Sequence, residues 1–156
     1  MILYFAYGSN MSRALMAKHA PQAAPIGVAR LAHYRFVITA DGYASVVPRR
    51  AANVYGVLWR LGARDRVTLD AWEDVAGGLY RATTLPVFHA GRRREALVYL
   101  ARRCPSGRPR ANYMEFVIAA ALEWRLSHVY TQSLRRWLPG RGADAGARNL
   151  KEFRWT

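Results

Sequence analysis

The chain of 156 residues has little cysteine and no long apolar run. Cys104 is its only cysteine, so an intrachain disulfide and a cysteine metal cluster are both excluded. No apolar run reaches the roughly 18 residues that a membrane-spanning helix requires. Met1 to Phe5 also lack the basic segment of a signal peptide. The sequence therefore predicts a cytoplasmic protein that does not bind membranes.

Metal-binding histidine patterns are lacking as well. The histidines His19, His33, His89 and His128 show no spacing typical of a metal site. No nucleophile elbow of the GxSxG type and no Walker loop is found either. The missing histidine spacings disfavour a metal site.

Acidic residues are scarce, with 10 Asp and Glu against 24 Lys and Arg, which gives a formal net charge of +14. The densest arginine runs, at 92–94, 102–103 and 108–110, lie beside Gly or Pro in predicted turns. A solvated rim of arginine is the favoured interpretation. Nucleic-acid binding is disfavoured because no zinc-finger, basic-zipper or RRM motif accompanies the charge, but it remains an alternative that predicts steeply salt-dependent affinity.

Apolar residues make up 52% of the chain, enough for one domain with its own core. The order of the predicted elements is irregular, which indicates an α+β domain around a mixed or antiparallel sheet rather than βαβ repeats. Strands are expected at 2–6, 28–39, 43–48, 54–61, 79–89 and 95–101. Helices are expected at 12–18, 64–73, 113–126 and 127–138, with Ser12 as one cap and Asn112 with Glu115 as a capping box. We predict a single domain over 1–138 and a Gly/Arg-rich tail over 139–156.

The turn that follows the first predicted strand is one candidate site. A chain that passes from a strand through Gly8, Ser9 and Asn10 into a helix can direct several backbone N–H groups at one anion. Gly8 would permit a positive φ and a close approach of a ligand. The alternative interpretation is an ordinary strand–helix turn.

Three carboxylates, Asp70, Glu73 and Asp74, form the second candidate site. In a helix, Asp70 shares a face with both Glu73 and Asp74. Apolar neighbours that include Leu69 and Trp72 suggest that one carboxyl group is buried, which would raise its pKa and suit it to general acid–base catalysis. The alternative interpretation of the cluster is a solvated polar helix face before a glycine turn. For the isolated aromatic residues Tyr80 and Tyr113, packing in the core is the default interpretation.

Several segments together resemble the γ-glutamylcyclotransferase-like family, which includes AIG2-like proteins. The first segment is YFAYGSN at 4–10. The others follow in the order typical of the family: ARL at 29–31, ASVVP at 44–48, VYGVLW at 54–59, LDxxE at 69–73 and GLY at 78–80. The resemblance covers roughly residues 3–126. The sequence at 7–10 is YGSN, whereas YGSL is typical of the glutathione-specific branch of the family, so that branch is disfavoured.

This resemblance implies a small mixed β-barrel with flanking helices. It also implies release of 5-oxoproline from a small γ-glutamyl substrate, without metal or cofactor, by attack of the α-amine on the γ-carbonyl. Glu73 falls on the catalytic general acid/base of the family. The implied substrate-binding residues are Tyr4, Phe5, Ala6, Tyr7, Gly8, Ser9, Asn10, Tyr80 and Tyr113.

Two further points stay open at this stage. A binding module of the same fold, which holds a γ-glutamyl or carboxylate ligand without turnover, is an alternative to an enzyme because a fold does not fix a function. The group attached to the γ-carbonyl and the oligomeric state, including a homodimer, are likewise open.

Overall fold

Five β-strands form a closed barrel in the computed structural model, which describes residues 1–140. The elements in chain order are β1 (Ile2–Ala6), the 3-10 turn η1 (Ser9–Met11), α1 (Arg13–His19), β2 (Ala24–Ile38), β3 (Ala44–Leu61), α2 (Ala63–Trp72), β4 (Tyr80–His89), β5 (Arg92–Ala101), α3 (Tyr113–Glu123) and α4 (His128–Arg135). Most of the predicted tail, residues 141–156, lies outside the described residues.

The strands follow the order β1-β3-β2-β4-β5 around the barrel. Neighbouring strands run antiparallel except where β1 meets β5, a parallel contact that pairs Tyr4 with Leu97. The mixed barrel with flanking helices is therefore confirmed. It joins the first strand directly to the last one, so the N-terminal segment is held in the middle of the structure.

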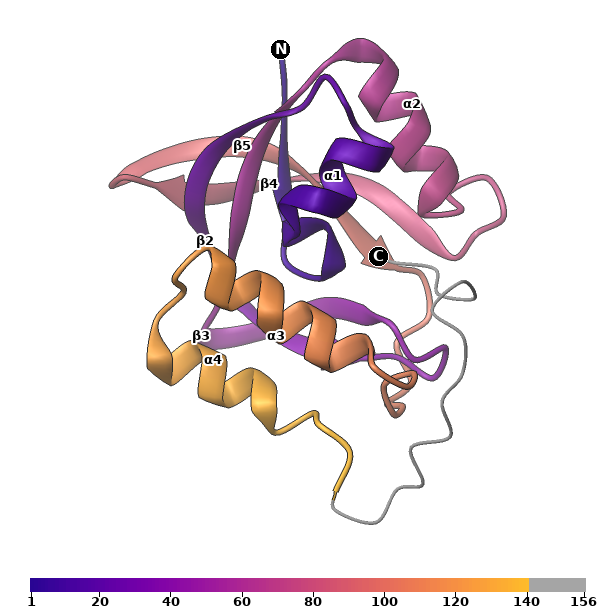
Figure 1. Cartoon of the computed structure of the whole chain (residues 1–156), viewed down its shortest axis with the longest axis vertical. Coiled ribbons are helices and arrows are strands. Elements are labelled where there is room, and N and C mark those ends of the chain that lie inside the picture. The colour runs from indigo at the N-terminus through magenta and orange to yellow at the C-terminus, as the bar shows by residue number, and fades with distance from the viewer. Residues whose placement is uncertain (141–156) are drawn as a thin grey trace.

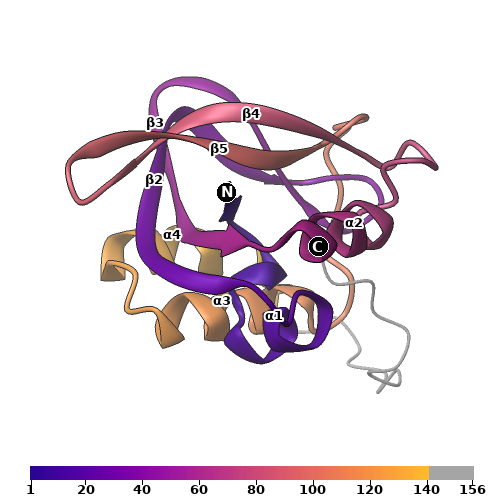
Figure 2. The ribbon, with the colours of Figure 1, turned by 90° about the horizontal axis from the view of Figure 1, so that it is seen from above.

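The helices gather around one part of the barrel. Figure 1 shows α3 and α4 side by side in the lower half of the molecule, at the level of part of β3, with α1 between α2 and α3. The view from above in Figure 2 shows the strands curving around the N-terminal strand and α3 with α4 along one side. Helix α1 follows β1 after a short turn, and α2 follows β3, the barrel neighbour of β1. The end of α1 meets the end of α2, where the rings of His19 and Trp72 stack with their centres 4.0 Å apart.

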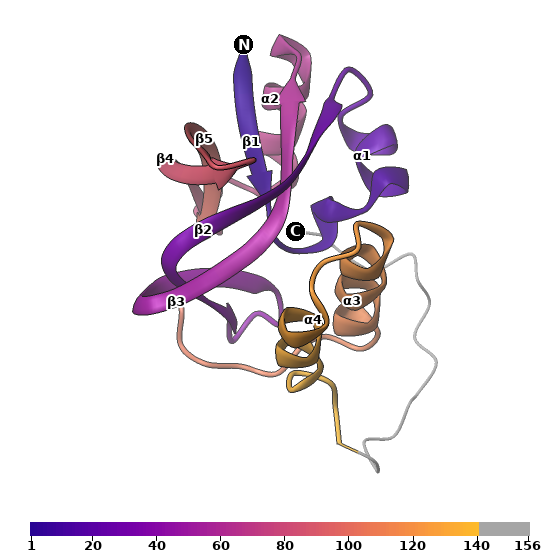
Figure 3. The same cartoon turned by 90° about the vertical axis from the view of Figure 1, so that its left-hand side faces the viewer.

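Strand β3 is one long ribbon, where the sequence predicts two separate strands. A β-bulge lies between Ala32 and Tyr34 of β2, and both His33 and Ala51 have φ of 63°. The Ala51 N–H donates to His33 Nδ1 at 3.3 Å across this irregularity. The bulge bends the two paired strands without ending the ladder, as the curved ribbon in Figure 3 shows.

The predicted cap at Ser12 is confirmed, whereas the predicted capping box is not. Ser12 Oγ accepts from the N–H of Leu15, and Ser127 caps α4 in the same way. The capping box at Asn112 is wrong, because Asn112 adopts a left-handed φ of 63° and its side chain makes no capping hydrogen bond. A tight turn, closed by the Tyr113 N–H to the Arg110 carbonyl, delivers the chain to α3 instead.

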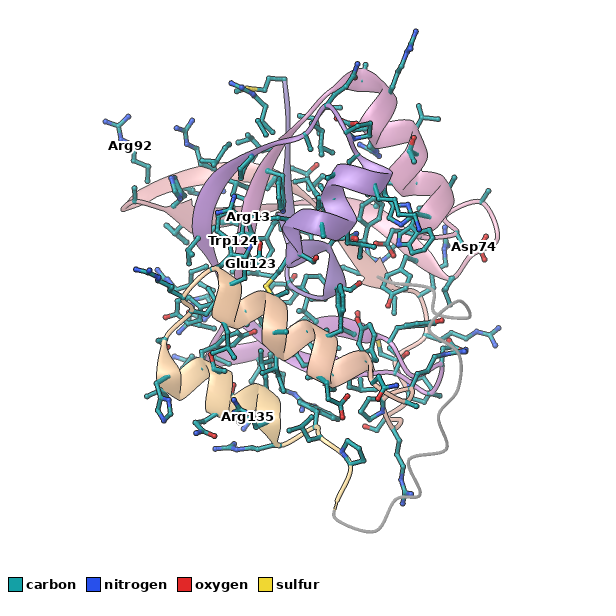
Figure 4. The ribbon with its side chains drawn as sticks, viewed as in Figure 1. Arg13, Asp74, Arg92, Glu123, Trp124 and Arg135 are labelled. Carbon is teal, nitrogen blue, oxygen red and sulfur yellow. The ribbon has the colours of Figure 1, made fainter. Side chains whose placement is uncertain are left out.

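The arginine runs all lie on the surface. Arg92, Arg93 and Arg94 are exposed at the tip of the β4–β5 hairpin, where Figure 4 shows Arg92 projecting from the body of the protein. The ion pair of Arg93 with Glu95, at 2.8 Å, is itself solvent-exposed. The arginines at 102, 103, 108 and 110 are exposed as well. These positions agree with a solvated rim.

Candidate functional site

One face of α2 carries Glu73 into the interior. Asp65, Leu69 and Glu73 recur every fourth residue, and their exposed fractions are 1%, 0% and 2%. Residues at this spacing share one side of a helix. Leu69 and Glu73 therefore both face the interior, whereas Val67 is 70% exposed on another side of the helix.

Both ends of α2 are fixed by local hydrogen bonds. The Asp65 carboxylate accepts from the N–H groups of Gly62 and Gln22 at 2.8 and 3.1 Å, which ties the start of the helix to the segment before β2. At the other end, the Glu73 N–H donates to the Leu69 carbonyl at 2.8 Å, and Asp74 turns the chain away with φ of 51°. Glu73 is thus the last residue held on the inner face.

The Glu73 carboxyl group meets the turn that follows β1. Asn10 Nδ2 donates to Glu73 Oε1 at 3.2 Å and to the Tyr4 hydroxyl at 2.9 Å. Asn10 is 1% exposed. The other carboxyl oxygen, Glu73 Oε2, has no hydrogen-bond partner in residues 1–140. Burial raises the pKa of Glu73 well above its ordinary value of 4.5, because desolvation disfavours the charged form.

Two buried phenols surround this carboxyl group. Burial first, and then the negative charge of Glu73, raise the pKa of both Tyr4 and Tyr7 well above 10.0. Tyr7 donates its hydroxyl proton to the Tyr99 carbonyl at 2.5 Å. Both phenols therefore remain neutral hydrogen-bonding groups beside the carboxyl group rather than acting as bases.

Tyr80 and Tyr113 converge on the first residue of β3. The Tyr80 hydroxyl donates to the Ala44 carbonyl at 2.5 Å, and the Ala44 N–H donates to the Tyr113 hydroxyl at 3.2 Å. Electrostatic interaction with Tyr113 also contributes to the raised pKa values of Tyr4 and Tyr7. The wholly buried Ser45 follows Ala44, and its side chain bonds to that of Tyr7. The sequence assigned no role to Ser45.

The turn from Tyr7 to Asn10 is fully buried, although its backbone differs from the expectation. Gly8 has φ of −114°, so it does not use the positive φ that a glycine permits. The N–H groups of Met11 and Ser12 donate to the carbonyls of Gly8 and Ser9, closing the turn. The N–H groups of Met11 and Ser12 are therefore already used within the turn and are not directed at an anion.

Phe5 and Ala6 lie between this turn and the barrel core. Phe5 is wholly buried, and a Cβ built on Gly56 would lie 3.0 Å from its ring. That Cβ would also lie 2.2 Å from the Ala6 carbonyl oxygen. These contacts place Phe5 and Ala6 against β3, as part of the packing that supports the turn.

Asp70 and Asp74, the other acids of the predicted cluster, take other places. Asp70 accepts from Arg66 Nε at 2.9 and 3.0 Å and from the Tyr99 hydroxyl at 2.6 Å. Asp74 lies in the turn after α2, as labelled in Figure 4, and is partly exposed. Glu73 is therefore the buried member of the predicted acidic cluster.

Trp124 is a supporting residue that the sequence did not assign to the site. Its indole nitrogen donates to the carbonyl oxygen of Met11 at 2.6 Å, next to Asn10. The guanidinium of Arg13 lies 3.7 Å from the centre of the Trp124 ring and pairs with Glu123 at 3.2 Å. Figure 4 shows these three residues together, where α3 ends near the start of α1. An apolar helix pattern alone gives no signal of this contact.

Metal-binding groups and membrane-spanning helices are both absent from the part of the chain that the structure describes. Within residues 1–140, no group of three or more His, Cys, Asp or Glu is placed to hold a metal ion. No helix in the same part is long and apolar enough to cross a membrane.

Comparison with known proteins decides the family. The model of the AIG2-like family matches residues 53–134, a stretch that contains Glu73, Tyr80 and Tyr113. The chain belongs to the AIG2-like family. Human γ-glutamylcyclotransferase, which is similar to this AIG2-like chain, is 27% identical over 144 residues, covering 85% of this chain and 77% of the human protein.

Solved structures share the fold of this AIG2-like chain. A structure titled as a γ-glutamyl cyclotransferase superposes with a TM-score of 0.84 at 25% identity, covering 91% of this chain and 90% of that one. The protein YkqA from Bacillus subtilis gives a TM-score of 0.75 at 27% identity, covering 86% of this chain and 53% of YkqA.

Proposed function

We propose that this AIG2-like protein is an enzyme that releases 5-oxoproline from a γ-glutamyl amino acid or γ-glutamyl amine. The observation that carries the proposal is the Glu73 carboxyl group, 2% exposed and bonded to Asn10 of the turn after β1. The names of the similar proteins, γ-glutamylcyclotransferase in human and mouse, support the same activity.

The reaction needs a group that carries protons between two nitrogens. The substrate α-amine is an ammonium at neutral pH and must lose a proton before it can attack its own γ-carbonyl. Of its three protons, one stays on the nitrogen of the 5-oxoproline ring and two end on the released amine, which leaves as an ammonium. Glu73 carries these protons one at a time, first as base and then as acid. A raised pKa suits both steps near neutral pH.

The surrounding residues supply position and charge stabilisation. The backbone of the segment from Tyr4 to Asn10 would hold the glutamyl carboxylate or the oxyanion that forms at the γ-carbonyl. One such donor contributes roughly 2.7–4 kcal/mol to transition-state stabilisation in well-studied enzymes. Tyr80 and Tyr113 fix the Ala44 peptide at the same end of the barrel. Holding the substrate folded brings the amine to the carbonyl, which is a proximity effect.

The test is 5-oxoproline release by the purified protein. γ-Glutamyl amino acids, γ-glutamyl amines and γ-glutamyl-ε-lysine are assayed with the wild type, with Glu73→Gln and with Glu115→Gln. Glu115 is an exposed acid of α3 and provides the matched control. We expect release by the wild type and by Glu115→Gln, and none by Glu73→Gln with an unchanged circular dichroism spectrum. Full activity of Glu73→Gln would overturn the role of Glu73, and binding without release by the wild type would indicate a binding module.

A further inference from the structure

Two neighbouring buried oxygens in the site have no hydrogen-bond donor within residues 1–140. Asn10 Oδ1 and Glu73 Oε2 are each buried and without a partner in the part of the chain that the structure describes. They belong to the two side chains that the 3.2 Å hydrogen bond joins, and both residues are at least 98% buried. Unpaired buried acceptors are rare in folded proteins, so the donors for these two oxygens must come from a molecule other than the described chain.

The orientation of the Asn10 carboxamide follows from its partners. In the ionised form, which Glu73 must adopt to take a proton from a substrate, the carboxylate only accepts hydrogen bonds, so the amide nitrogen is the atom that faces Glu73 Oε1. The second N–H of the same nitrogen goes to the Tyr4 hydroxyl at 2.9 Å. Both amide protons are therefore used, and Oδ1 is the part of Asn10 left to interact with a ligand.

The chemistry of these two oxygens selects the ligand class. One is a neutral amide acceptor and the other is part of an anion, so a cationic group with several donors is the best match. A primary ammonium has three N–H donors and no acceptor, as in a lysine side chain. A hydroxyl or a secondary amide would offer one donor and would leave one of the two oxygens unpaired.

We propose that Asn10 Oδ1 is a second acceptor for the substrate α-ammonium, beside Glu73 Oε2. This rests on the proposed function and adds a specificity-determining residue to it. Asn10 then acts through both ends of its carboxamide: Nδ2 holds Glu73, and Oδ1 holds the amine that Glu73 deprotonates. Recognition of the γ-glutamyl unit thus depends on its free α-amine before any proton moves.

The experiment compares two ligands that differ only in the α-amine, γ-glutamylalanine and N-glutarylalanine. The KM of the first and the inhibition constant of the second are measured for the wild type, Asn10→Leu and Asn10→Asp. Asn53→Leu is the matched control, because Asn53 is exposed on β3. We expect Asn10→Leu to raise the KM for γ-glutamylalanine roughly tenfold or more, as loss of a hydrogen bond to a charged group does. The inhibition constant of N-glutarylalanine should stay within about twofold.

Asn10→Asp covers the case in which Asn10→Leu does not fold. It keeps an acceptor oxygen in the same place, and two adjacent carboxyl groups that share a proton retain one negative charge. We expect it to keep the preference for the amine-bearing ligand. A wild type with equal affinity for the two ligands, or variants that weaken both ligands equally, would overturn the inference.

Failure of the proposed function gives a different result. If the wild type releases no 5-oxoproline, the affinities of the same two ligands are measured by calorimetry. A preference for γ-glutamylalanine that Asn10→Leu removes would uphold the ammonium site without the reaction. Release of 5-oxoproline that is unaffected by Asn10→Leu would uphold the reaction and refute the ammonium site.

Discussion

The indole nitrogen of Trp124 donates to the carbonyl oxygen of Met11 at 2.6 Å, although the two residues are 113 positions apart in the chain. Met11 is wholly buried, and it directly follows Asn10, whose side chain holds Glu73. The end of α3 therefore braces the turn that carries half of the proposed site. Arg13 covers the outer face of the same indole ring.

Trp124→Phe should damage both stability and catalysis. The phenyl ring keeps a surface for Arg13 and Trp59, but the buried Met11 carbonyl loses its donor. Leaving a buried acceptor unpaired costs about 1–3 kcal/mol of unfolding free energy. A small displacement of Asn10 should also lower kcat/KM roughly tenfold. Urea denaturation and steady-state 5-oxoproline release measure the two effects.

Trp137→Phe is the matched control for that variant. Trp137 follows α4 and packs edge-on against Phe36. Removing its indole nitrogen should leave kcat/KM within about twofold of the wild type, because Phe36 is not part of the proposed site. Equal losses of activity in the two variants would contradict a specific role for Trp124.

Glu73→Gln should stabilise the protein while it abolishes catalysis. Burial raises the folded-state pKa of Glu73, so the folded protein binds more protons than the unfolded chain at intermediate pH. Unfolding free energy therefore falls as pH rises through the ordinary pKa, by about 1.36 kcal/mol per pH unit until the folded-state pKa is reached. The glutamine side chain of the variant does not titrate, so this dependence is absent from it.

The measurement for this prediction is urea unfolding of both proteins between about pH 4 and pH 8, a range that begins near the ordinary carboxyl pKa. The unfolding free energy of Glu73→Gln should increase relative to that of the wild type as pH rises. The difference in unfolding free energy should be smallest at the acidic end of the range. Glu115→Gln, at an exposed site, should follow the wild type throughout. A constant difference across the range would show that the buried carboxyl group is not the cause.

Sequence reasoning succeeded where the signal is local or where scarcity points to a residue. The span of β1 and the Ser12 cap follow from adjacent residues, and both are observed as predicted. The cluster of Asp70, Glu73 and Asp74 stood out because the chain has few carboxylates and these have apolar neighbours, and the family resemblance selected Glu73 among them. Its burial is explained by the every-fourth-residue spacing with Leu69.

The parts that the sequence missed depend on contacts between distant residues. Asn10 and Glu73 are 63 positions apart, and periodicity within either segment cannot show that they pair. The sequence predicted a break between the two halves of β3, since it could not show that a bulge in β2 keeps them paired. Asn112 has the residue type of a cap, but the preceding tight turn places it in a left-handed conformation where its side chain cannot reach the helix.

Gly56→Ala should strongly destabilise the barrel. A Cβ at this position would lie 2.2 Å from the Ala6 carbonyl oxygen, a backbone atom that cannot move without shifting β1. Overpacking of this kind costs about 1–3 kcal/mol or more, and the displaced strand carries Tyr4. Gly140→Ala, at a glycine whose added Cβ would meet no heavy atom of the described residues within 4 Å, is the control. Similar urea midpoints for the two variants would disprove the close approach.

Asp70→Asn tests whether Glu73 is the only carboxyl group of the cluster that the reaction needs. Asp70 lies one turn from Glu73, but its oxygens are already occupied by Arg66 and the Tyr99 hydroxyl. The Arg66–Asp70 ion pair is about one-third exposed, so its loss has a small effect on stability. Together with a weaker hydrogen bond from the Tyr99 hydroxyl, the loss should cost only about 1–2 kcal/mol of unfolding free energy. Release of 5-oxoproline should continue at close to the wild-type kcat. If Asp70→Asn instead abolished release as Glu73→Gln is expected to do, proton transfer would require both carboxyl groups, and the assignment of both steps to Glu73 would have to be abandoned.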